Sequence, residues 1–253
     1  MKYALIDMGS NSIRLTVYDV TQTNFKILFK EKIMAGLAGY VENGYLTQDG
    51  IDCACQSLRE FQNTLKLLQI EHLAVFATAS LRNITNTSHA VEQIRCATGI
   101  AVEILTGEAE AEYGFQGATC DIKIAGGLFA DVGGASSELA LFTGQQVEKA
   151  GSVPVGSLKL YRDCVKKILP GRESRRRIES SIRTAFDRDA LKGIPHEDHM
   201  VCVGGTARAS LRLCRKRFGL SEDCRTFTRE QLDALAKELC RGDKAAADLI
   251  LRY

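Results

Sequence analysis

The sequence predicts an α/β fold with two related lobes, and two observations carry this prediction. Apolar segments typical of strands alternate with amphipathic segments typical of helices, and one strand-turn-strand pattern with an Asp-x-Gly turn occurs twice. The 253 residues are 45% hydrophobic and 25% charged, which is enough chain and apolar surface for two lobes. We expect an N-terminal lobe at residues 1–122 and a second lobe at residues 123–253.

The first segments predict a small sheet and a helix that covers it. Residues 3–7, 13–20 and 25–33 are rich in apolar and β-branched side chains, as expected for a meander of three strands. Thr47 is suited to an N-cap, and the apolar residues within 51–68 then recur with the helical period. This helix would bury its apolar face against the sheet.

The middle of the chain continues with alternating strands and helices. We predict a strand at residues 72–77 and a helix at residues 88–98. A second strand at residues 100–105 and a second helix at residues 108–118 follow. Gly99 ends the first of these helices, because glycine readily adopts the left-handed conformation of a C-cap. Residues 126–142 then repeat the strand-turn-strand pattern of the opening.

The two repeated turns are the main candidates for a binding site. Each begins with an acid at a strand end, Asp7 or Asp131, and continues with small and polar residues whose backbone N–H groups suit an anion such as phosphate. The candidate phosphate-binding residues are Gly9, Ser10, Asn11, Ser12, Gly133, Gly134, Ala135, Ser136 and Ser137. Either turn alone is also typical of a plain hairpin, but the matching context of the two favours a shared function.

Other polar residues offer catalytic or binding groups. Glu108 and Glu112 share one helix face and Glu110 points nearly the opposite way, although acids in a first turn also simply complement the helix dipole. Arg82 follows a strand in a turn of small residues and suits a phosphate, or it is an ordinary surface arginine. Residues 204–206, Gly-Gly-Thr before a helix, are a weaker anion-site candidate.

Composition narrows the choice of partners and compartment. The net charge of +2 gives no general attraction to nucleic acid or membranes, so any polyanion site must be local. The arginine-rich run at residues 171–189 is interleaved with acids and indicates a solvated helix face or a guide for polyanions. The nine cysteines lack a Cys-x-x-Cys spacing, and no apolar run is long enough to cross a bilayer, so we expect a cytoplasmic protein without nucleic-acid or membrane partners.

Five motifs in this order resemble the exopolyphosphatase and guanosine pentaphosphate phosphohydrolase (Ppx/GppA) family. They are IDMGSNSIRL, ATASLR, TGEAEAE, ADVGGASSEL and VGGTARA, and together they cover essentially the whole chain. The resemblance implies the two-lobed fold of actin, sugar kinases and heat-shock chaperone ATPases, with ribonuclease H-like lobes and an active site in the interlobe cleft. It also implies that a homodimer is an available assembly.

The resemblance further implies roles for residues of this chain. The catalytic glutamate of the family falls on Glu110, and Asp131 would help in catalysis and, with Glu138, hold Mg²⁺. The first turn, with Arg14 nearby, would hold phosphates, and Arg82 would bind the terminal one. The expected activity is Mg²⁺-dependent release of terminal phosphate from inorganic polyphosphate or guanosine pentaphosphate, which needs mainly positioning and charge neutralisation.

The chain departs from the family pattern in three ways. Ala135 replaces a glycine, which we expect to crowd a phosphate or to forbid a positive φ in the turn. Glu112 stands where the family usually has arginine, which would weaken polyanion binding. The second lobe is expected to lack the final strand and helix of the family. These departures leave two alternatives open, a catalytically weak sensor of polyphosphate or alarmone and an ATP-dependent phosphotransferase.

Overall fold

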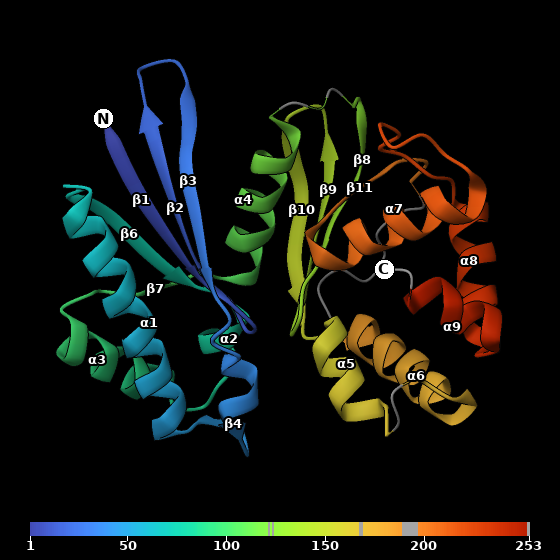
Figure 1. Cartoon of the computed structure of the whole chain (residues 1–253), viewed down its shortest axis with the longest axis horizontal. Helices are drawn as coiled ribbons and strands as arrows, with labels where there is room; N and C mark the ends of the chain where they lie inside the picture. The colour runs from blue at the N-terminus through green and yellow to red at the C-terminus, as the bar shows by residue number, and fades with distance from the viewer. Residues whose placement is uncertain (121, 123, 167–168, 189–196, 252–253) are drawn as a thin grey trace. The chain divides into compact units, whose positions relative to one another are not determined.

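The computed structural model describes residues 1–120, 122, 124–166, 169–188 and 197–251. The chain divides into two compact units, Met1–Glu110 and Ala111–Tyr253 (Figure 1). The division predicted from the sequence, between residues 122 and 123, adjoins positions 121 and 123, which lie outside the described residues.

The first unit is built on a mixed sheet with the order β3-β2-β1-β6-β7. Its elements are β1 (Lys2–Met8), β2 (Ile13–Val20), β3 (Phe25–Ile33), the 3₁₀ helix η1 (Leu37–Tyr40), β4 (Val41–Glu42), β5 (Tyr45–Leu46), α1 (Gln48–Leu67), β6 (His72–Ala77), α2 (Ala79–Arg82), α3 (Thr87–Thr98) and β7 (Glu103–Ile104). β1 pairs antiparallel with β2 and parallel with β6, so the meander is joined to a crossover strand.

The core of the first unit lies where α1 and α3 cover this sheet (Figure 1). Alternate residues of β1, namely Ala4, Ile6 and Met8, are fully buried, as the period of a half-buried strand requires. The Thr47 side chain accepts a hydrogen bond from the Gly50 amide at the start of α1, which confirms the predicted N-cap.

The second unit repeats the topology of the first. Its elements are β8 (Gly126–Val132), β9 (Ser137–Thr143), β10 (Gln146–Val153), α5 (Ser157–Cys164), α6 (Arg172–Arg188), β11 (Met200–Val203), α7 (Gly204–Phe218), α8 (Arg229–Arg241) and α9 (Lys244–Leu251). Helix α4 (Gly107–Thr119) belongs to the second unit from Ala111 onward. The sheet order is β10-β9-β8-β11, again an antiparallel meander joined to a parallel strand.

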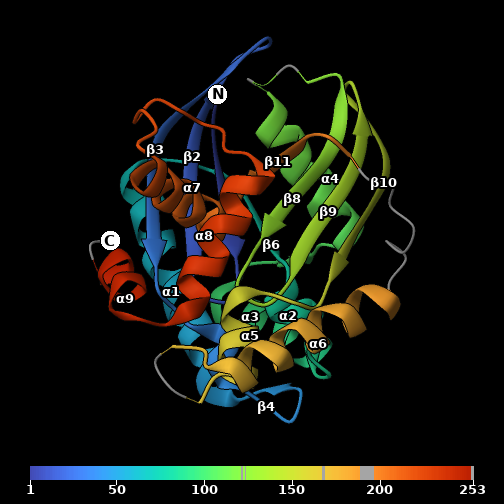
Figure 2. The same cartoon turned by 90° about the vertical axis from the view of Figure 1, so that its right-hand side faces the viewer.

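Both faces of the second sheet are covered. On one face Phe115 of α4 packs against Phe129 and Phe142 of β8 and β9, with ring centroids 6.3 Å and 4.6 Å apart. Figures 1 and 2 show α7 along the other face. Among the described residues this sheet has no strand in the position that β7 occupies in the first sheet.

Two further findings concern the chain as a whole. No helix among the described residues is long and apolar enough to cross a membrane. All nine cysteines lie among those residues and are free thiols.

Candidate functional site

The first candidate turn, residues 9–12, joins β1 to β2. The Gly9 amide donates to the Ser12 carbonyl oxygen at 3.1 Å, which closes the turn. A Cβ added at Gly9 would lie 3.1 Å from that same oxygen, so glycine keeps the closure unstrained. Ser12 is buried, while Asn11 is exposed at the tip.

A segment after β3 holds the carbonyl side of this turn. The Gly36 amide donates to Asn11 O at 3.0 Å and the Ala38 amide donates to Ser10 O at 2.9 Å. Within the described part of the chain, the amides of Ser10 and Asn11 themselves donate no hydrogen bond. The turn therefore has its carbonyl groups satisfied and two amides available to an anion, as in a backbone nest.

The second turn, residues 133–136, has a similar construction. The Gly133 amide donates to Ser136 O at 3.0 Å, and the amides of Ser157 and Lys159 at the start of α5 donate to the carbonyl oxygens of Gly133 and Gly134 at 2.9 Å and 3.0 Å. We call residues 36–38 and 157–159 the support segments of the two turns. The Gly-to-Ser closure is the same in both turns, whereas the supported carbonyl groups are those of the second and third residues in the first turn and of the first and second residues in the second turn.

Ala135 does not impose the backbone problem expected of it. Neither Ala135 nor Gly134 adopts a positive φ, so an L-residue fits the backbone of this turn without strain. As in the first turn, the amides of Gly134 and Ala135 donate no hydrogen bond within the described residues. The expectation that the methyl group forbids the turn geometry was therefore wrong.

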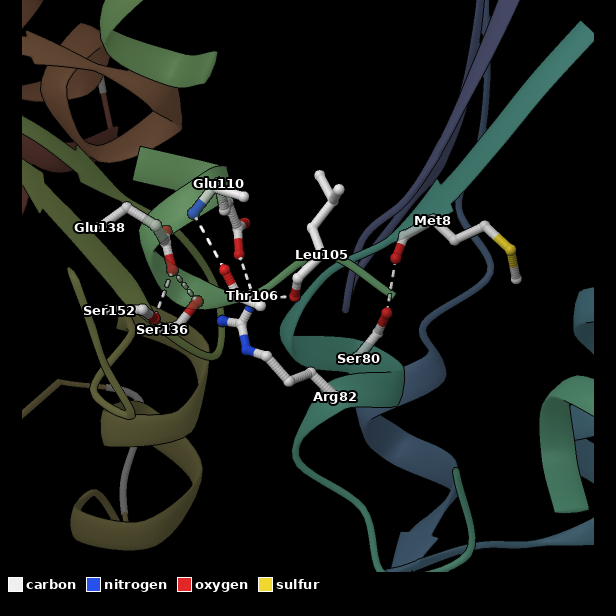
Figure 3. A network of polar contacts seen from close by, with 10 residues as sticks. Met8, Ser80, Arg82, Leu105, Thr106, Glu110, Ser136, Glu138 and Ser152 are labelled. Atoms are coloured by element: carbon white, nitrogen blue, oxygen red, sulfur yellow. Dashed lines mark hydrogen bonds and ion pairs between the residues drawn. The ribbon is translucent and has the colours of Figure 1, made fainter. Parts of the chain in front are cut away.

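Arg82 and Glu110 form an ion pair in the first unit (Figure 3). Arg82 Nη1 lies 2.7 Å from Glu110 Oε2 and donates to Leu105 O at 3.0 Å, and the two side chains are only 17% and 20% exposed. The turn predicted around Arg82 is a single helical turn, α2. Ser80 of α2 donates from its hydroxyl to Met8 O at 2.5 Å, which ties this helix to the end of β1.

Glu110 differs from the other two acids of its helix. Thr106 begins α4, since its hydroxyl accepts from the Ala109 amide at 3.1 Å and its carbonyl accepts from the Glu110 amide at 3.0 Å. Glu108 and Glu112 are exposed, as expected for acids on an outer helix face. The geometry thus singles out Glu110 as the acid that faces a guanidinium. The Arg14 side chain, by contrast, is 56% exposed, and its Nη1 lies 4.0 Å from Asp7 Oδ2.

Asp131 and Glu138 lie opposite each other on the paired strands β8 and β9. They are register partners in β8 and β9, which puts both side chains on the same face of the sheet. Glu138 is 3% exposed, and its Oε1 accepts from the hydroxyls of Ser136 at 2.6 Å and Ser152 at 2.7 Å (Figure 3). Two hydroxyl donors on one oxygen stabilise the charge of this nearly buried carboxylate.

The Gly-Gly-Thr motif lies beside Asp131. Gly204 has a φ of +88°, and a Cβ at this position would collide with Asp131 Oδ1. The Thr206 hydroxyl donates to Val132 O at 3.1 Å, which holds the first turn of α7 at the end of β8. The Gly-Gly-Thr motif, the weaker anion-site candidate, therefore lies next to Asp131.

The carboxylates of Asp131 and Glu138 suit a magnesium ion whose remaining ligands are waters and the oxygens of a bound phosphate. Among the described residues no group of three or more His, Cys, Asp and Glu side chains is arranged to hold a metal by itself. Mg²⁺ is usually bound through one or two carboxylates, waters and substrate phosphates, so the pair Asp131 and Glu138 beside a phosphate-type turn fits it.

Several residues of these sites were not found from the sequence. Ser152 hydrogen bonds Glu138 from the neighbouring strand β10, and its position follows only from the pairing of that strand with β9. The support segments contribute backbone amides, which leave no mark in composition. Gly156 is a detectable signal in hindsight, because a glycine before a helix permits the close approach that α5 makes to the second turn.

Comparisons with known proteins agree with this architecture. A family model described as the Ppx/GppA phosphatase family matches residues 16–249. A bifunctional 3-dehydroquinate synthase/phosphatase of Fusobacterium nucleatum is 29% identical over 62% of this chain. The match covers 25% of that relative, so the chain spans about a quarter of its length.

Solved structures show the fold. A crystal structure of the Ppx/GppA family member of Aquifex aeolicus has a TM-score of 0.68 and 25% identity, covering 91% of this chain and 72% of that one. An exopolyphosphatase from Cytophaga hutchinsonii has a TM-score of 0.80 and 21% identity, covering 95% and 80%. The predicted fold class, an α/β fold of the actin, sugar-kinase and chaperone ATPase type, is confirmed.

Proposed function

Because the chain belongs to the Ppx/GppA phosphatase family, we propose that it is a Mg²⁺-dependent phosphohydrolase. Its substrate would be inorganic polyphosphate or guanosine pentaphosphate, from which it releases the terminal phosphate. The family match and the likeness to an exopolyphosphatase support the reaction class. The two repeated turns support a phosphate-rich substrate, because each presents two backbone amides to an anion.

The reaction needs a water, a base and charge neutralisation. Water attacks the terminal phosphorus, the bond from that phosphorus to the bridging oxygen breaks, and the shortened chain leaves with the electron pair on that oxygen. Glu110 accepts the proton of the attacking water. The products are inorganic phosphate and a chain one phosphate shorter, so atoms and charges balance without any further reactant.

The residues of the first unit are suited to this chemistry. The Arg82 guanidinium fixes the direction of the Glu110 carboxylate, since Nη1 and Oε2 meet at 2.7 Å in a half-buried position. A guanidinium has five N–H donors, so Arg82 can bond Glu110 and a phosphate oxygen together. The first turn would bind phosphate oxygens through the amides of Ser10 and Asn11.

The residues of the second unit would bind phosphate and the metal ion. Asp131 would hold Mg²⁺, and Glu138, fixed by two serine hydroxyls, would orient waters around it. When bound, Mg²⁺ supplies positive charge that stabilises phosphate oxygens as negative charge develops on them. The backbone amides of Gly134 and Ala135 would donate hydrogen bonds to phosphate oxygens of the substrate.

One observation carries the choice of base. Glu110 is the acid of α4 that is half buried and paired with an arginine, whereas Glu108 and Glu112 are exposed on the same helix. A catalytic base must be held in position and shielded from bulk water, and these conditions are met at Glu110 alone among the three.

The test compares identical changes on one helix. Phosphate release from long polyphosphate, tripolyphosphate, guanosine pentaphosphate and ATP is measured with and without Mg²⁺ for the wild type, Glu110→Gln and the control Glu108→Gln. We expect Glu110→Gln to lower turnover about 10²- to 10⁴-fold, as for loss of a general base, and Glu108→Gln to stay within about twofold of the wild type.

Each other outcome has a definite meaning. Equal turnover of Glu110→Gln and wild type would overturn the assignment of the base. Release that is independent of Mg²⁺ would overturn the role of Asp131 as a metal ligand. Tight binding of polyphosphate without any release would replace the hydrolase by a sensor, and ATP turnover that requires an added acceptor would replace it by a phosphotransferase.

A further inference from the structure

Helix α7 carries the most one-sided charge in the second unit. Its fifteen residues include Arg208, Arg212, Arg215, Lys216 and Arg217 and no acid. The arginine-rich run of the sequence, now α6, is by comparison mixed, since it contains Glu173, Glu179 and Asp187, and Arg177 pairs with Glu173. A protein with a net charge of +2 thus concentrates five cations on one helix.

Two of these five cations have structural roles. Arg215 donates from Nε to Cys224 O at 2.7 Å, which fixes the loop after the helix. Arg217 pairs with Glu238 of α8 and lies over the ring of Phe218. Both lie in the last turn, where the helix dipole also favours cations. The other three cations of the helix are Arg208, Arg212 and Lys216.

The remaining cations form a stripe. Arg208, Arg212 and Lys216 follow one another at intervals of four residues, so they lie on one face of α7, and all three are exposed. The opposite face is the buried one and contains Cys214. Arg208 makes no hydrogen bond or ion pair within the part of the chain that the structure describes. We call these three residues the α7 stripe.

The stripe begins near Asp131 and leads away from it. α7 starts at Gly204, against the Asp131 carboxylate, and Arg208 follows one turn later. At a rise of about 1.5 Å per residue, the stripe extends about 12 Å along the helix from Arg208 to Lys216. It is therefore a line of positive charge along a helix whose first residue lies against Asp131.

From this arrangement we propose that the α7 stripe is a subsite for the distal part of a linear polyphosphate chain. The proposal rests on the proposed function and deepens it, because it makes long chains the preferred substrate. A linear polyphosphate repeats its negative charge along its length, which matches cations spaced along a helix. A nucleotide presents a ribose and a base instead, and the exposed neighbours on this face, Gly205 and Ala209, offer no ring or pocket to them.

The experiment compares a variant that loses two cations of the α7 stripe with a control variant that loses two cations of another helix. The test variant is Arg208→Gln/Arg212→Gln, and the control is Arg176→Gln/Arg183→Gln on exposed positions of α6. Glutamine has nearly the helix propensity of arginine, so both proteins should fold. Dissociation constants for long-chain polyphosphate and for tripolyphosphate are measured at two salt concentrations, and phosphate release is measured separately.

We expect the test variant to lose roughly tenfold in the ratio of long-chain to tripolyphosphate affinity, as for two lost cation contacts to a polyanion. Its long-chain affinity should also depend less steeply on salt, by about one unit of log–log slope for each cation removed. Adding Lys216→Gln should extend the loss, while the α6 control should keep the wild-type ratio.

The failures of the two proposals are distinguishable. An unchanged affinity ratio in the test variant, or an equal loss in the α6 control, would overturn the stripe as a subsite even if the protein hydrolyses polyphosphate. If no substrate is hydrolysed but the test variant still loses long-chain affinity selectively, the hydrolase proposal fails and the stripe stands as a polyphosphate-binding surface.

Discussion

Alanine at position 156 is expected to displace the second turn. Gly156 is the N-cap of α5 with φ −138° and ψ 163°, a conformation open to any residue, so the substitution carries no backbone-conformation penalty. A Cβ at this position would lie 2.5 Å from the Ala135 amide nitrogen and would also collide with the Gly134 carbonyl group. The Gly156→Ala variant therefore isolates the close approach of α5 to the turn.

The cost follows from how far the two segments must separate. Ordinary contact begins at 3.4 Å, so α5 and the turn must move apart by about 1 Å, which stretches the hydrogen bonds from Ser157 and Lys159. Overpacking of this kind costs about 1–3 kcal/mol and each weakened hydrogen bond up to about 1 kcal/mol. A total of about 3 kcal/mol corresponds to a Tm lower by roughly 6–12 °C for a chain of this size.

The assay is thermal unfolding followed by circular dichroism, beside phosphate release. Gly117→Ala is the matched control, because a Cβ at Gly117 meets no atom within 4 Å and the residue lies inside α4. The control should gain about 0.5–1 kcal/mol, since alanine favours a helix over glycine. A Tm of Gly156→Ala within about 2 °C of the wild type would refute the reasoning, because the predicted separation of α5 from the turn would then cost almost nothing.

Two further predictions concern carboxylates outside the proposed base. Ser152→Ala should lower the free energy of unfolding in urea by about 1.5–3 kcal/mol, because buried Glu138 loses a charge-assisted hydrogen-bond donor. The control Ser88→Ala, on the exposed face of α3, should change this free energy by less than about 0.5 kcal/mol. Equal effects of the two substitutions would contradict the buried hydrogen-bond network around Glu138. Hydrogen bonds from Arg95, then Cys96, hold the pKa of Glu92 at about 2 instead of 4.5, so the stabilisation from this group is full above pH 4.5 and lost as the pH falls through about 2. An NMR titration of the Glu92 carboxyl carbon should have its midpoint near 2, and a midpoint near 4.5 would show that the pair with Arg95 does not form in solution.

The local parts of the fold could be predicted from the sequence. The bounds of β2, β3 and β6 were predicted without error, because β-branched and apolar residues in short runs leave few alternatives. The strand predicted at residues 100–105 was too long, since only Glu103–Ile104 pairs with β6. Ile100 and Val102 are apolar because they are buried in the core, and burial gives the same pattern as strand pairing.

The candidate site could be predicted only where side-chain chemistry marks it. The pattern of small residues indicated both turns, and the pairing of Arg82 with Glu110 joins two residues that were identified separately. Ser152 and the support segments depend on strand pairing and on backbone contacts between residues distant in sequence, which no local pattern records. The effect of Ala135 on the backbone of the turn was misjudged because the conformation of a turn cannot be assigned from composition when alanine and glycine both fit it.

The support segments also make the two turns separately observable by hydrogen exchange. The amide protons of Gly36 and Ala38 are bonded to the first turn, and those of Ser157 and Lys159 to the second. Each pair can exchange with solvent only when its own turn separates from its support segment. A phosphate compound that engages one turn would slow exchange at one pair and leave the other at its free rate, so the chain contains an internal reporter of occupancy for each unit.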